Sequence, residues 1–349
     1  MNAAQKATRN SARTPLLIAA GVVIIAIVAG AVWWFASRAD SASAENPAGA
    51  GTAAAGSAVT GEVRGPAGAP SERADGLPSE TAMGVNELKV RDLAAVRAYY
   101  EDAIGLSILE ERAGEVLLGL AKTPLIRLTE SEEPLPKPDD AGLYHTAILY
   151  PDEATLAQTL LRAAEQAPAS FQGSADHRVS QAFYFGDPEG NGLELYVDRP
   201  EEEWTWVDGQ VVMGSEALDP NEFITTHLSG EALGTASMGH VHLKVGNLDE
   251  AREFYADTLG FDVVSEADGA LFYSAGGYHH HLATNTWMSS GAGPRSSEVG
   301  LGSVSITLPD TASVDAVAER ARAAGVAVDA VAGGIVVADP WGNLVRVVV

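Results

Sequence analysis

Three consecutive histidines, His279, His280 and His281, form the densest group of reactive side chains in the 349-residue chain, which holds eight histidines and no cysteine. Imidazoles titrate near neutral pH, so this cluster could bind a metal ion or move protons. In a β-strand, alternate side chains point to opposite faces, which would separate His280 from its two neighbours. Taken alone, the triplet leaves a solvated polar turn as the alternative.

Composition excludes several other kinds of chemistry. A net charge of −25 without a basic stripe argues against a nucleic-acid partner, because nucleic-acid binding needs a basic surface. The absence of cysteine excludes disulfides, thiolate ligands and a cysteine nucleophile. The length indicates two or three domains with room for apolar cores.

The first residues predict attachment to a membrane. Residues 1–14 form a basic tail, and the run from Leu16 to Phe35 is uncharged and about twenty residues long, enough to cross a bilayer. We expect a transmembrane anchor at 15–37, with the tail in the cytoplasm and everything after it outside. The alternative is a long signal peptide cleaved near Ala42-Ser43-Ala44, which would release a secreted protein. Residues 38–80, rich in Ala, Gly, Ser and Pro, predict a disordered linker.

After the linker the sequence repeats. Met83–Val90 matches Met238–Val245, and the same offset carries Gly105 onto Gly260. The two copies align without gaps through an expected strand, an expected helix and a glycine that ends the helix. This alignment indicates a duplicated unit.

A second pair of segments also repeats. His145–Asp152 parallels Ser303–Asp310, and each precedes an alanine-rich helix. Each segment then ends in an Asp-Pro-x-Gly-Asn hairpin. The helices are expected at Glu153–Gln166 and Ser313–Ala324, and the hairpins at Asp187–Leu195 and Asp339–Val347.

These repeats predict an α+β fold of four βαβββ modules. Two modules side by side make a cupped sheet that can hold a ligand. The modules lie near 84–129, 142–198, 238–288 and 299–349. The predicted domains are 81–200 for modules 1 and 2, 201–236 as a connection, and 237–349 for modules 3 and 4.

The region from Met83 to Val349 resembles the vicinal-oxygen-chelate (glyoxalase/bleomycin resistance/dioxygenase) superfamily, and within it two-domain extradiol dioxygenases of the catechol 2,3-dioxygenase type. The general signals are MGHVHLKV at 238–245 and the two DPxGN hairpins. The more specific ones are LYHTAILYPD at 143–152, ADHRVSQAFYFGDPEGNGLELYVDRP at 175–200 and GGYHHHLATNTW at 276–287.

The resemblance implies metal ligands at fixed strand positions, which are His145, Glu194 and His240 here. Only pairing module 2 with module 3 brings all three together, as the two-histidine, one-carboxylate triad of non-haem iron oxygenases. The complementary pairing of modules 1 and 4 would present Val85, Ser303 and Arg346, and we expect no metal there.

The resemblance also implies the proton-handling residues. A His-His-x-Leu-Ala stretch supplies the acid or base in ring-cleaving relatives, which maps that role onto His280, preceded by His279. His281 is the competing residue. Tyr184 would hydrogen-bond the substrate or oxygen, and His177 is a weaker candidate behind the residues that touch the metal or substrate.

The function implied is that of an Fe(II)-dependent extradiol dioxygenase that acts on a small aromatic diol with O2. Mn(II) or another divalent ion is the alternative metal. Alternative functions are a glyoxalase-like isomerase, which needs a further protein ligand, and a metal-free small-molecule-binding protein of the resistance type. The membrane is expected as a partner through the N-terminal helix only, and a homo-oligomer is left open.

Overall fold

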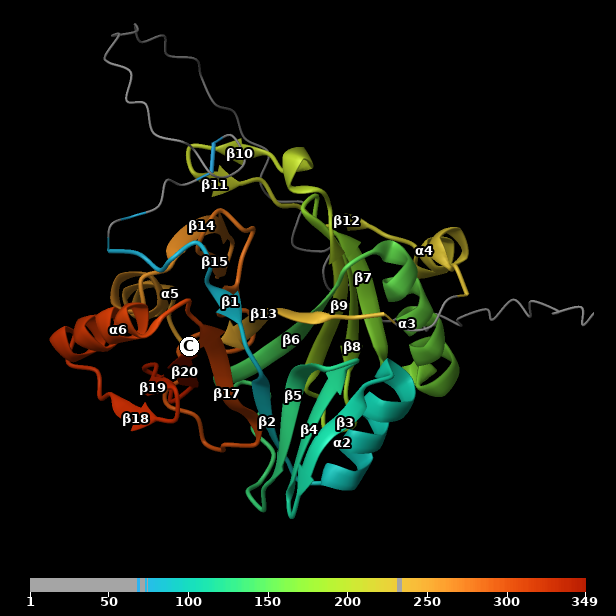
Figure 1. Ribbon diagram of the computed structural model, residues 1–349, viewed down its shortest axis with the longest axis horizontal. Helices are drawn as coiled ribbons and strands as arrows, with labels where there is room; N and C mark the ends of the chain where they lie inside the picture. Colours follow the sequence, from blue (N-terminus) through green and yellow to red (C-terminus); the bar gives the residue numbers. More distant parts are fainter. Residues whose placement is uncertain (1–67, 70–72, 74, 231–233) are drawn as a thin grey trace, which may run out of the picture.

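The computed structural model describes residues 68–69, 73, 75–230 and 234–349 (Figure 1). The basic tail, the transmembrane prediction at 15–37 and most of the predicted linker lie outside the described residues. The last part of that linker is described, however. Leu77 is buried, and its N–H donates to the carbonyl of Gly260 at 2.9 Å.

The predicted localisation needs correction. Among the described residues, no helix has both the length and the apolar character that crossing a bilayer requires. The prediction of a membrane-anchored protein with an extracytoplasmic catalytic part is therefore wrong as stated, and the membrane as a partner has no support.

Two nine-stranded sheets carry the four modules, and each sheet combines one module from each half of the chain. The first runs β18-β19-β20-β17-β2-β5-β4-β3, with β1 paired to β17. Its strands are β1 (Ala82–Met83), β2 (Asn86–Val90), β3 (Ser107–Arg112), β4 (Glu115–Leu120), β5 (Thr123–Glu130), β17 (Gly300–Thr307), β18 (Asp329–Val331), β19 (Gly334–Ala338) and β20 (Leu344–Val348).

The second sheet runs β12-β7-β8-β9-β6-β13-β16-β15-β14. Antiparallel pairing of β6 with β13 joins module 2 to module 3, and this confirms the pairing predicted from the ligand positions. The strands are β6 (Gly142–Tyr150), β7 (Phe171–Asp176), β8 (Ser180–Gly186), β9 (Gly192–Asp198), β12 (Glu216–Ala217), β13 (Ser237–Lys244), β14 (Asp262–Ala267), β15 (Ala270–Ser274) and β16 (Leu282–Asn285).

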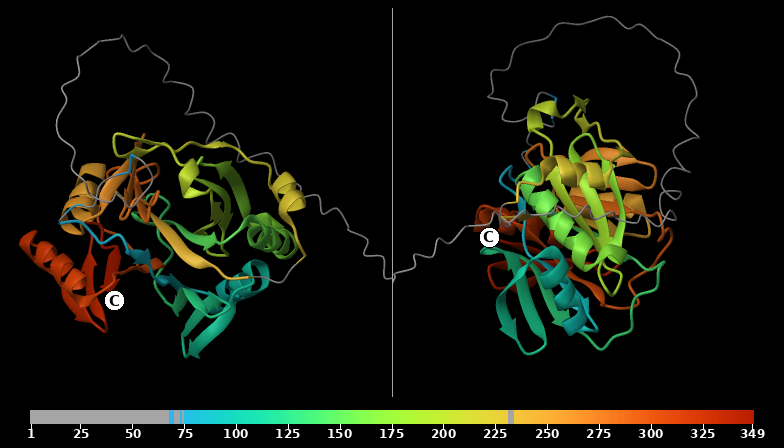
Figure 2. Two further views of the ribbon diagram at one scale, coloured as in Figure 1. Left: turned by 45° about the horizontal axis from the view of Figure 1, so that its top comes forward. Right: turned by 90° about the vertical axis from the view of Figure 1, so that its right-hand side faces the viewer.

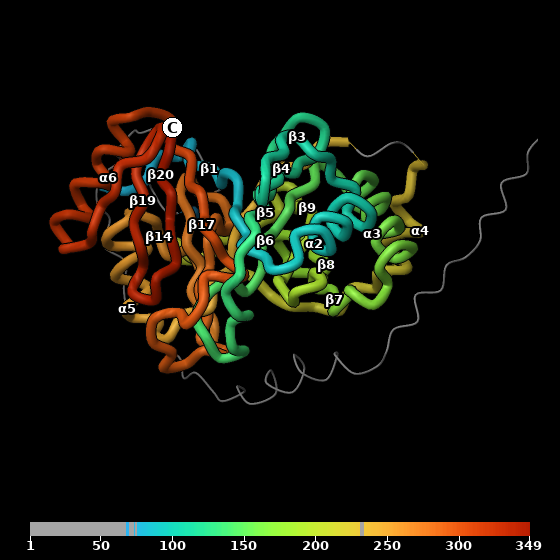
Figure 3. Tube along the Cα trace, turned by 90° about the horizontal axis from the view of Figure 1, so that it is seen from below, coloured from blue at the N-terminus to red at the C-terminus, as the bar shows by residue number. Residues whose placement is uncertain are grey.

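The helices pack in pairs within each half of the chain. The Arg162 guanidinium on α3 donates to the carbonyl of Asp102, and Arg320 on α6 donates to that of Leu259. Figure 3 shows the two halves side by side, cyan to green and orange to red. The helices are α2 (Leu93–Tyr99), α3 (Glu153–Gln166), α4 (Pro220–His227), α5 (Leu248–Arg252) and α6 (Thr311–Ala323).

Both α2 and α5 continue into a π-helical turn, at Tyr100–Ile104 and Glu253–Thr258. The predicted glycine stops follow, and Gly105 and Gly260 have φ angles of 82° and 99°. Glycine suits these positions because a side chain is strained in the left-handed region.

The Asp-Pro-x-Gly-Asn turns are held by their own aspartates. Oδ1 of Asp187 accepts the backbone N–H of Glu189 and of Asn191, and its Oδ2 accepts the Asn191 side chain. Asp339 bonds its turn in the same way. These buried carboxylates are therefore structural.

Residues 201–230 cross one end of the second sheet (Figure 2). They contain a 3₁₀ turn at Glu201–Glu203, the small hairpin of β10 (Trp206–Val207) and β11 (Gln210–Val211), then β12 and α4. Trp204 and Trp206 are buried there and form a small apolar cluster with Val179, Val211 and Val264.

Candidate metal centre

The three predicted ligands meet on one face of the second sheet. The Nε2 atom of His145 on β6 lies 3.0 Å from Oε2 of Glu194 on β9. The Nε2 atom of His240 on β13 lies 3.3 Å from the same oxygen and 3.3 Å from Nε2 of His145. All three side chains are buried. They form the only group of three or more potential metal-ligating residues among the residues that the structure describes.

This donor set fits a metal ion. Two ligands at 90° around an ion, each about 2.1 Å from it, have donor atoms about 3 Å apart. The three donor atoms already have that spacing. Two imidazole nitrogens and a carboxylate that converge in a buried corner repel one another unless a proton or a cation lies between them. Two histidines and one carboxylate are the donors that non-haem Fe(II) uses.

The charge states also suit metal binding. Burial alone would raise the pKa of Glu194, but the adjacent His240 and His145 outweigh it and hold that pKa well below its usual range. Burial lowers the pKa of His240 even though Glu194 opposes the shift. An ionised carboxylate and a neutral imidazole are the forms that ligate metals.

Strand alternation explains why these residues share a face. On β9, Leu193 and Leu195 pack in the core while Glu194 between them faces the cup. On β13, Val241 lies in the core between His240 and His242. The face of the sheet covered by helix α3 is therefore apolar.

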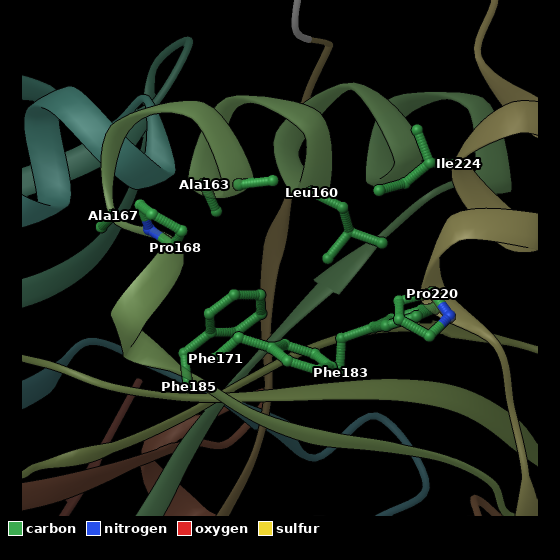
Figure 4. Close-up of a pocket in the computed structure, with 10 residues that line it drawn as sticks. Leu160, Ala163, Ala167, Pro168, Phe171, Phe183, Phe185, Pro220 and Ile224 are labelled. Atoms are coloured by element: carbon green, nitrogen blue, oxygen red, sulfur yellow. The ribbon is translucent and has the colours of Figure 1, made fainter. Parts of the chain in front are cut away.

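That covered face contains a small cavity of about 10 Å³ (Figure 4). The side chains around it are apolar and include Leu160, Phe183, Phe185 and Ile224. Tyr184, between the two phenylalanines, points to the opposite face. The cavity is a packing gap with no chemistry of its own.

Gly239, next to the ligand His240, leaves room for a tyrosine side chain beside the metal centre. The pairing of β6 with β13 shifts register between Met238 and His240, which leaves Gly239 as an extra residue. A Cβ atom at Gly239 would lie 1.9 Å from the hydroxyl oxygen of Tyr196. The Tyr196 ring then contacts the His240 ring, with centroids 5.0 Å apart.

The histidine triplet lies just before β16, so the expected strand alternation does not apply to it. His280 stacks against the ligand His240, with ring centroids 4.1 Å apart. His279 shares a hydrogen bond with His280, between the two Nδ1 atoms, at 2.8 Å. Two of the three rings therefore lie together on the metal side.

His281 turns away into the core. Its Nδ1 atom lies 3.2 Å from the Ser274 hydroxyl and accepts the backbone N–H of Ala275 at 3.3 Å. Burial, and then His279, lower the pKa of His281 to about 3. This histidine has the surroundings of a neutral core residue.

Tyr184 and His177 form a pair beside the ligands. The Tyr184 ring lies 5.7 Å from the His145 ring, centroid to centroid. The Tyr184 hydroxyl is 2.6 Å from Nε2 of His177, and Nδ1 of His177 is 2.7 Å from the carbonyl of Gly214. A carbonyl can only accept, so Nδ1 carries the proton of the neutral ring and the hydroxyl donates to Nε2. Burial, and then Glu194, raise the pKa of Tyr184 well above its usual value.

The sequence reasoning missed Tyr144, His242 and Phe272, which lie beside the ligands or beside one another. A bulge in β6 puts Tyr144 next to His145, and the Tyr144 ring also contacts His242 and Trp287 at 5.0 and 5.4 Å between centroids. The His242 ring lies 6.0 Å from that of Phe272. The spacing of His240 and His242 by two residues on an expected strand was a usable signal for His242. Nothing in the sequence signalled the bulge.

Comparison with known proteins agrees with this geometry. Residues 83–195 and 237–347 match the sequence profile described as Glyoxalase/Bleomycin resistance protein/Dioxygenase superfamily. A catechol-2,3-dioxygenase from Bacillus subtilis (strain 168) is 37% identical over 279 residues, covering 76% of this chain and 95% of the relative.

The chain is also similar to solved structures. A putative dioxygenase from Bacillus subtilis has a TM-score of 0.50 at 15% identity, over 76% of this chain and 85% of that chain. Glyoxalase I from Zea mays has a TM-score of 0.46 at 17% identity, over 77% and 92%. With the sequence match over both halves, the chain belongs to the Glyoxalase/Bleomycin resistance protein/Dioxygenase superfamily and is a homologue of catechol-2,3-dioxygenase.

Proposed function

We propose that this protein is an Fe(II)-dependent extradiol dioxygenase that uses O2 to cleave the ring of catechol-like aromatic diols. The observation that carries the proposal is the buried corner in which His145, Glu194 and His240 converge at 3.0–3.3 Å. The 37% identical relative is a catechol-2,3-dioxygenase, which supports the same chemistry.

Three protein side chains would hold the metal ion, and no other described residue joins this group of donors. When bound, Fe(II) would supply adjacent positions for a diol and O2 and would carry electrons between them. Mn(II) is the alternative, because imidazole and carboxylate donors suit both ions. The buried ligands keep bulk water away from the reacting groups, since their side chains are at most 8% exposed.

The neighbouring side chains favour a flat and uncharged substrate. Tyr144, His242, Trp287 and Phe272 present rings beside the ligands, and aromatic rings attract one another at such distances. Burial holds the pKa of His242 well below its usual value, so this ring is neutral. A catechol ring could lie against these rings without bringing a buried charge.

Two side chains are suited to handle protons. His280 is assigned the base, because burial, followed by the nearby His240 and His279, holds its pKa well below the usual range and keeps the ring neutral. Its Nε2 atom would take a proton from a diol hydroxyl. Tyr184 stays a phenol whose proton is donated to His177, so its oxygen would accept a hydrogen bond from the diol. His279 supports His280, and His281 has a structural role.

The isomerase alternative finds less support. A glyoxalase-like isomerase would need a further protein ligand, and the group of donors within reach of one another among the described residues contains three members. A metal-free binding protein would not need two buried histidines around a carboxylate, because burying these polar groups costs free energy that a bound metal ion would offset.

The test is direct. The full chain is prepared without oxygen, loaded with Fe(II), and mixed with catechol and O2, and absorbance is followed for the yellow ring-opened semialdehyde. We expect colour that depends on both iron and O2. An iron-loaded protein that consumes no O2 with catechol or its alkyl derivatives would contradict the proposal.

A further inference from the structure

A chain of hydrogen bonds connects the end of strand β9 to the proposed base. Oδ1 of Asp198 lies 2.8 Å from Nε2 of His279, and Nδ1 of His279 lies 2.8 Å from Nδ1 of His280. His279 is fully buried, and the Trp204 ring covers it at 5.1 Å between centroids. Among the described residues, no hydrogen bond engages the Nε2 atom of His280.

The direction of these bonds follows from the chemistry of the groups. The carboxylate of Asp198 can only accept, so Nε2 of His279 carries a proton. In the neutral ring, Nδ1 of His279 is then an acceptor. The proton between the two rings therefore belongs to Nδ1 of His280, and its Nε2 atom keeps a free lone pair.

Two tyrosines complete the hydrogen bonding around the carboxylate at the end of the chain. The Tyr278 hydroxyl donates to Oδ2 of Asp198 at 2.9 Å, and its oxygen lies 2.8 Å from the Tyr196 hydroxyl. Burial raises the pKa of both tyrosines well above its usual value, so both stay protonated. Because Tyr278 donates its proton to Asp198, the Tyr196 hydroxyl must donate to Tyr278. Every donor in the network thus points toward Asp198.

The position of Asp198 is built into the sheet. It follows Glu194 and Tyr196 at alternate positions of β9, so all three lie on the cup face. Asp198 reaches His279 and touches none of the three proposed ligands. It can therefore act on the base without acting on the metal.

We infer that Asp198 is a positioning residue that acts through His279 to fix the tautomer of His280, with the proton on Nδ1 and the lone pair on Nε2. A ring in the other tautomer would present an N–H, which cannot accept a proton. The claim that this tautomer assists catalysis rests on the proposed function. The claim that His280 adopts this tautomer is independent of the proposed function.

The first measurement needs no metal and no substrate. In the metal-free full chain labelled with ¹⁵N-histidine, long-range ¹H–¹⁵N correlation spectra report which nitrogen of each ring carries the proton. We expect His280 to be protonated at Nδ1 and His279 at Nε2, with a His280→Gln sample to assign the signals. A proton on Nε2 of His280 would overturn the inference.

Variants of Asp198 test the cause. In Asp198→Ala we expect the His280 signals to move toward protonation at Nε2 or to a mixture, and Asp198→Glu should restore much of the Nδ1 form. Asp176→Asn is the matched control, because Asp176 bonds Arg199 at a neighbouring strand end and lies outside the network. Circular dichroism checks that each variant folds, and Asp198→Leu, which also removes the acceptor and has a larger side chain, is the substitute if Asp198→Ala does not. An unchanged tautomer in a folded variant that lacks the carboxylate acceptor, Asp198→Ala or Asp198→Leu, would contradict the inference.

A kinetic measurement separates positioning from binding. With iron loaded, Asp198→Ala should lose about 10–100-fold in kcat while KM and bound iron stay near those of the unaltered chain. Lost iron or a raised KM with unchanged kcat would contradict a positioning role. If the unaltered chain cleaves no diol but shows the expected tautomer, the proposed function fails while the inference about Asp198 stands.

Discussion

The Nε2 atom of His240 lies 3.3 Å from Oε2 of Glu194, although the two residues come from different halves of the chain. The contact exists because β6 pairs with β13, so that module 2 and module 3 share one sheet. The site is thus assembled across the duplication, and each half alone would hold an incomplete set of ligands.

The Tyr184 hydroxyl is expected to matter for turnover more than for binding. Tyr184→Phe removes the hydroxyl whose oxygen would accept a hydrogen bond from the diol, and it should lower kcat about 10²-fold with a small change in KM, because that contact would orient the reacting diol. Steady-state O2 consumption measures both constants. Tyr144→Phe is the control, since the Tyr144 hydroxyl makes no hydrogen bond among the described residues. An equal loss of kcat in Tyr184→Phe and Tyr144→Phe would argue against a specific role for the Tyr184 hydroxyl.

Gly239 should tolerate no side chain. In Gly239→Ala the new Cβ would lie 1.9 Å from the buried Tyr196 hydroxyl, so the free energy of unfolding should fall by about 1–3 kcal/mol. Gly84, its counterpart in module 1, would place a Cβ 3.0 Å from that of Ser305, so Gly84→Ala should cost less. Urea unfolding compares the two. A larger loss in Gly84→Ala would contradict the tight fit at Tyr196.

The four modules were predicted from a local sequence repeat, and the three candidate ligands were predicted from the family resemblance. The offset that aligns Met83 with Met238 reveals the repeat, and filled ligand positions at His145, Glu194 and His240 select the module pairing. The division of the chain into domains at 81–200 and 237–349 stays a prediction, while each sheet draws strands from both stretches.

The hydrogen bonds that connect Asp198, His279 and His280 could not be predicted from the sequence. Asp198 and His279 are far apart along the chain, and their contact depends on the turn that carries the triplet before β16. The triplet was expected to be extended strand, whereas Gly276 and Gly277 have φ angles of 67° and 77° just before it. These left-handed residues redirect the chain, so His279 and His280 lie together.

Substrates with a charged substituent should react poorly. The rings of Tyr144, His242, Trp287 and Phe272 offer no cation to a carboxylate, and Glu194 nearby is ionised. Burying an unpaired carboxylate there costs several kcal/mol, so kcat/KM for 3,4-dihydroxybenzoate should lie at least about 10²-fold below that for 4-methylcatechol. Comparable values for the two diols would show that the site contains a cation we have not assigned.

The free energy of unfolding should fall as the pH drops below about 6.5, because His281 stays neutral in the folded protein. Its pKa is about 3 in the folded protein, below the usual 6.5 or so of an unfolded chain, so the unfolded state binds more protons between these values. The stabilisation is complete above about pH 6.5 and is lost as the pH falls toward 3. Between pH 7 and 5 this histidine should account for about 2 kcal/mol.

Urea midpoints at the two pH values measure that effect in the metal-free protein. His281→Gln should be less stable at pH 7 but should show a shallower loss toward pH 5. An identical pH dependence in the variant would mean that His281 does not stay neutral in the core.

The measurement that tests the account most directly is the iron content of two matched variants, alongside their activity with catechol. Glu194→Gln removes the proposed carboxylate ligand, and Arg346→Gln changes the residue at the equivalent position of the first sheet. We expect Arg346→Gln to bind one iron per chain and to cleave catechol like the unaltered protein, while Glu194→Gln loses both the iron and the yellow product. Retention of iron and ring cleavage by Glu194→Gln would contradict the metal centre described here.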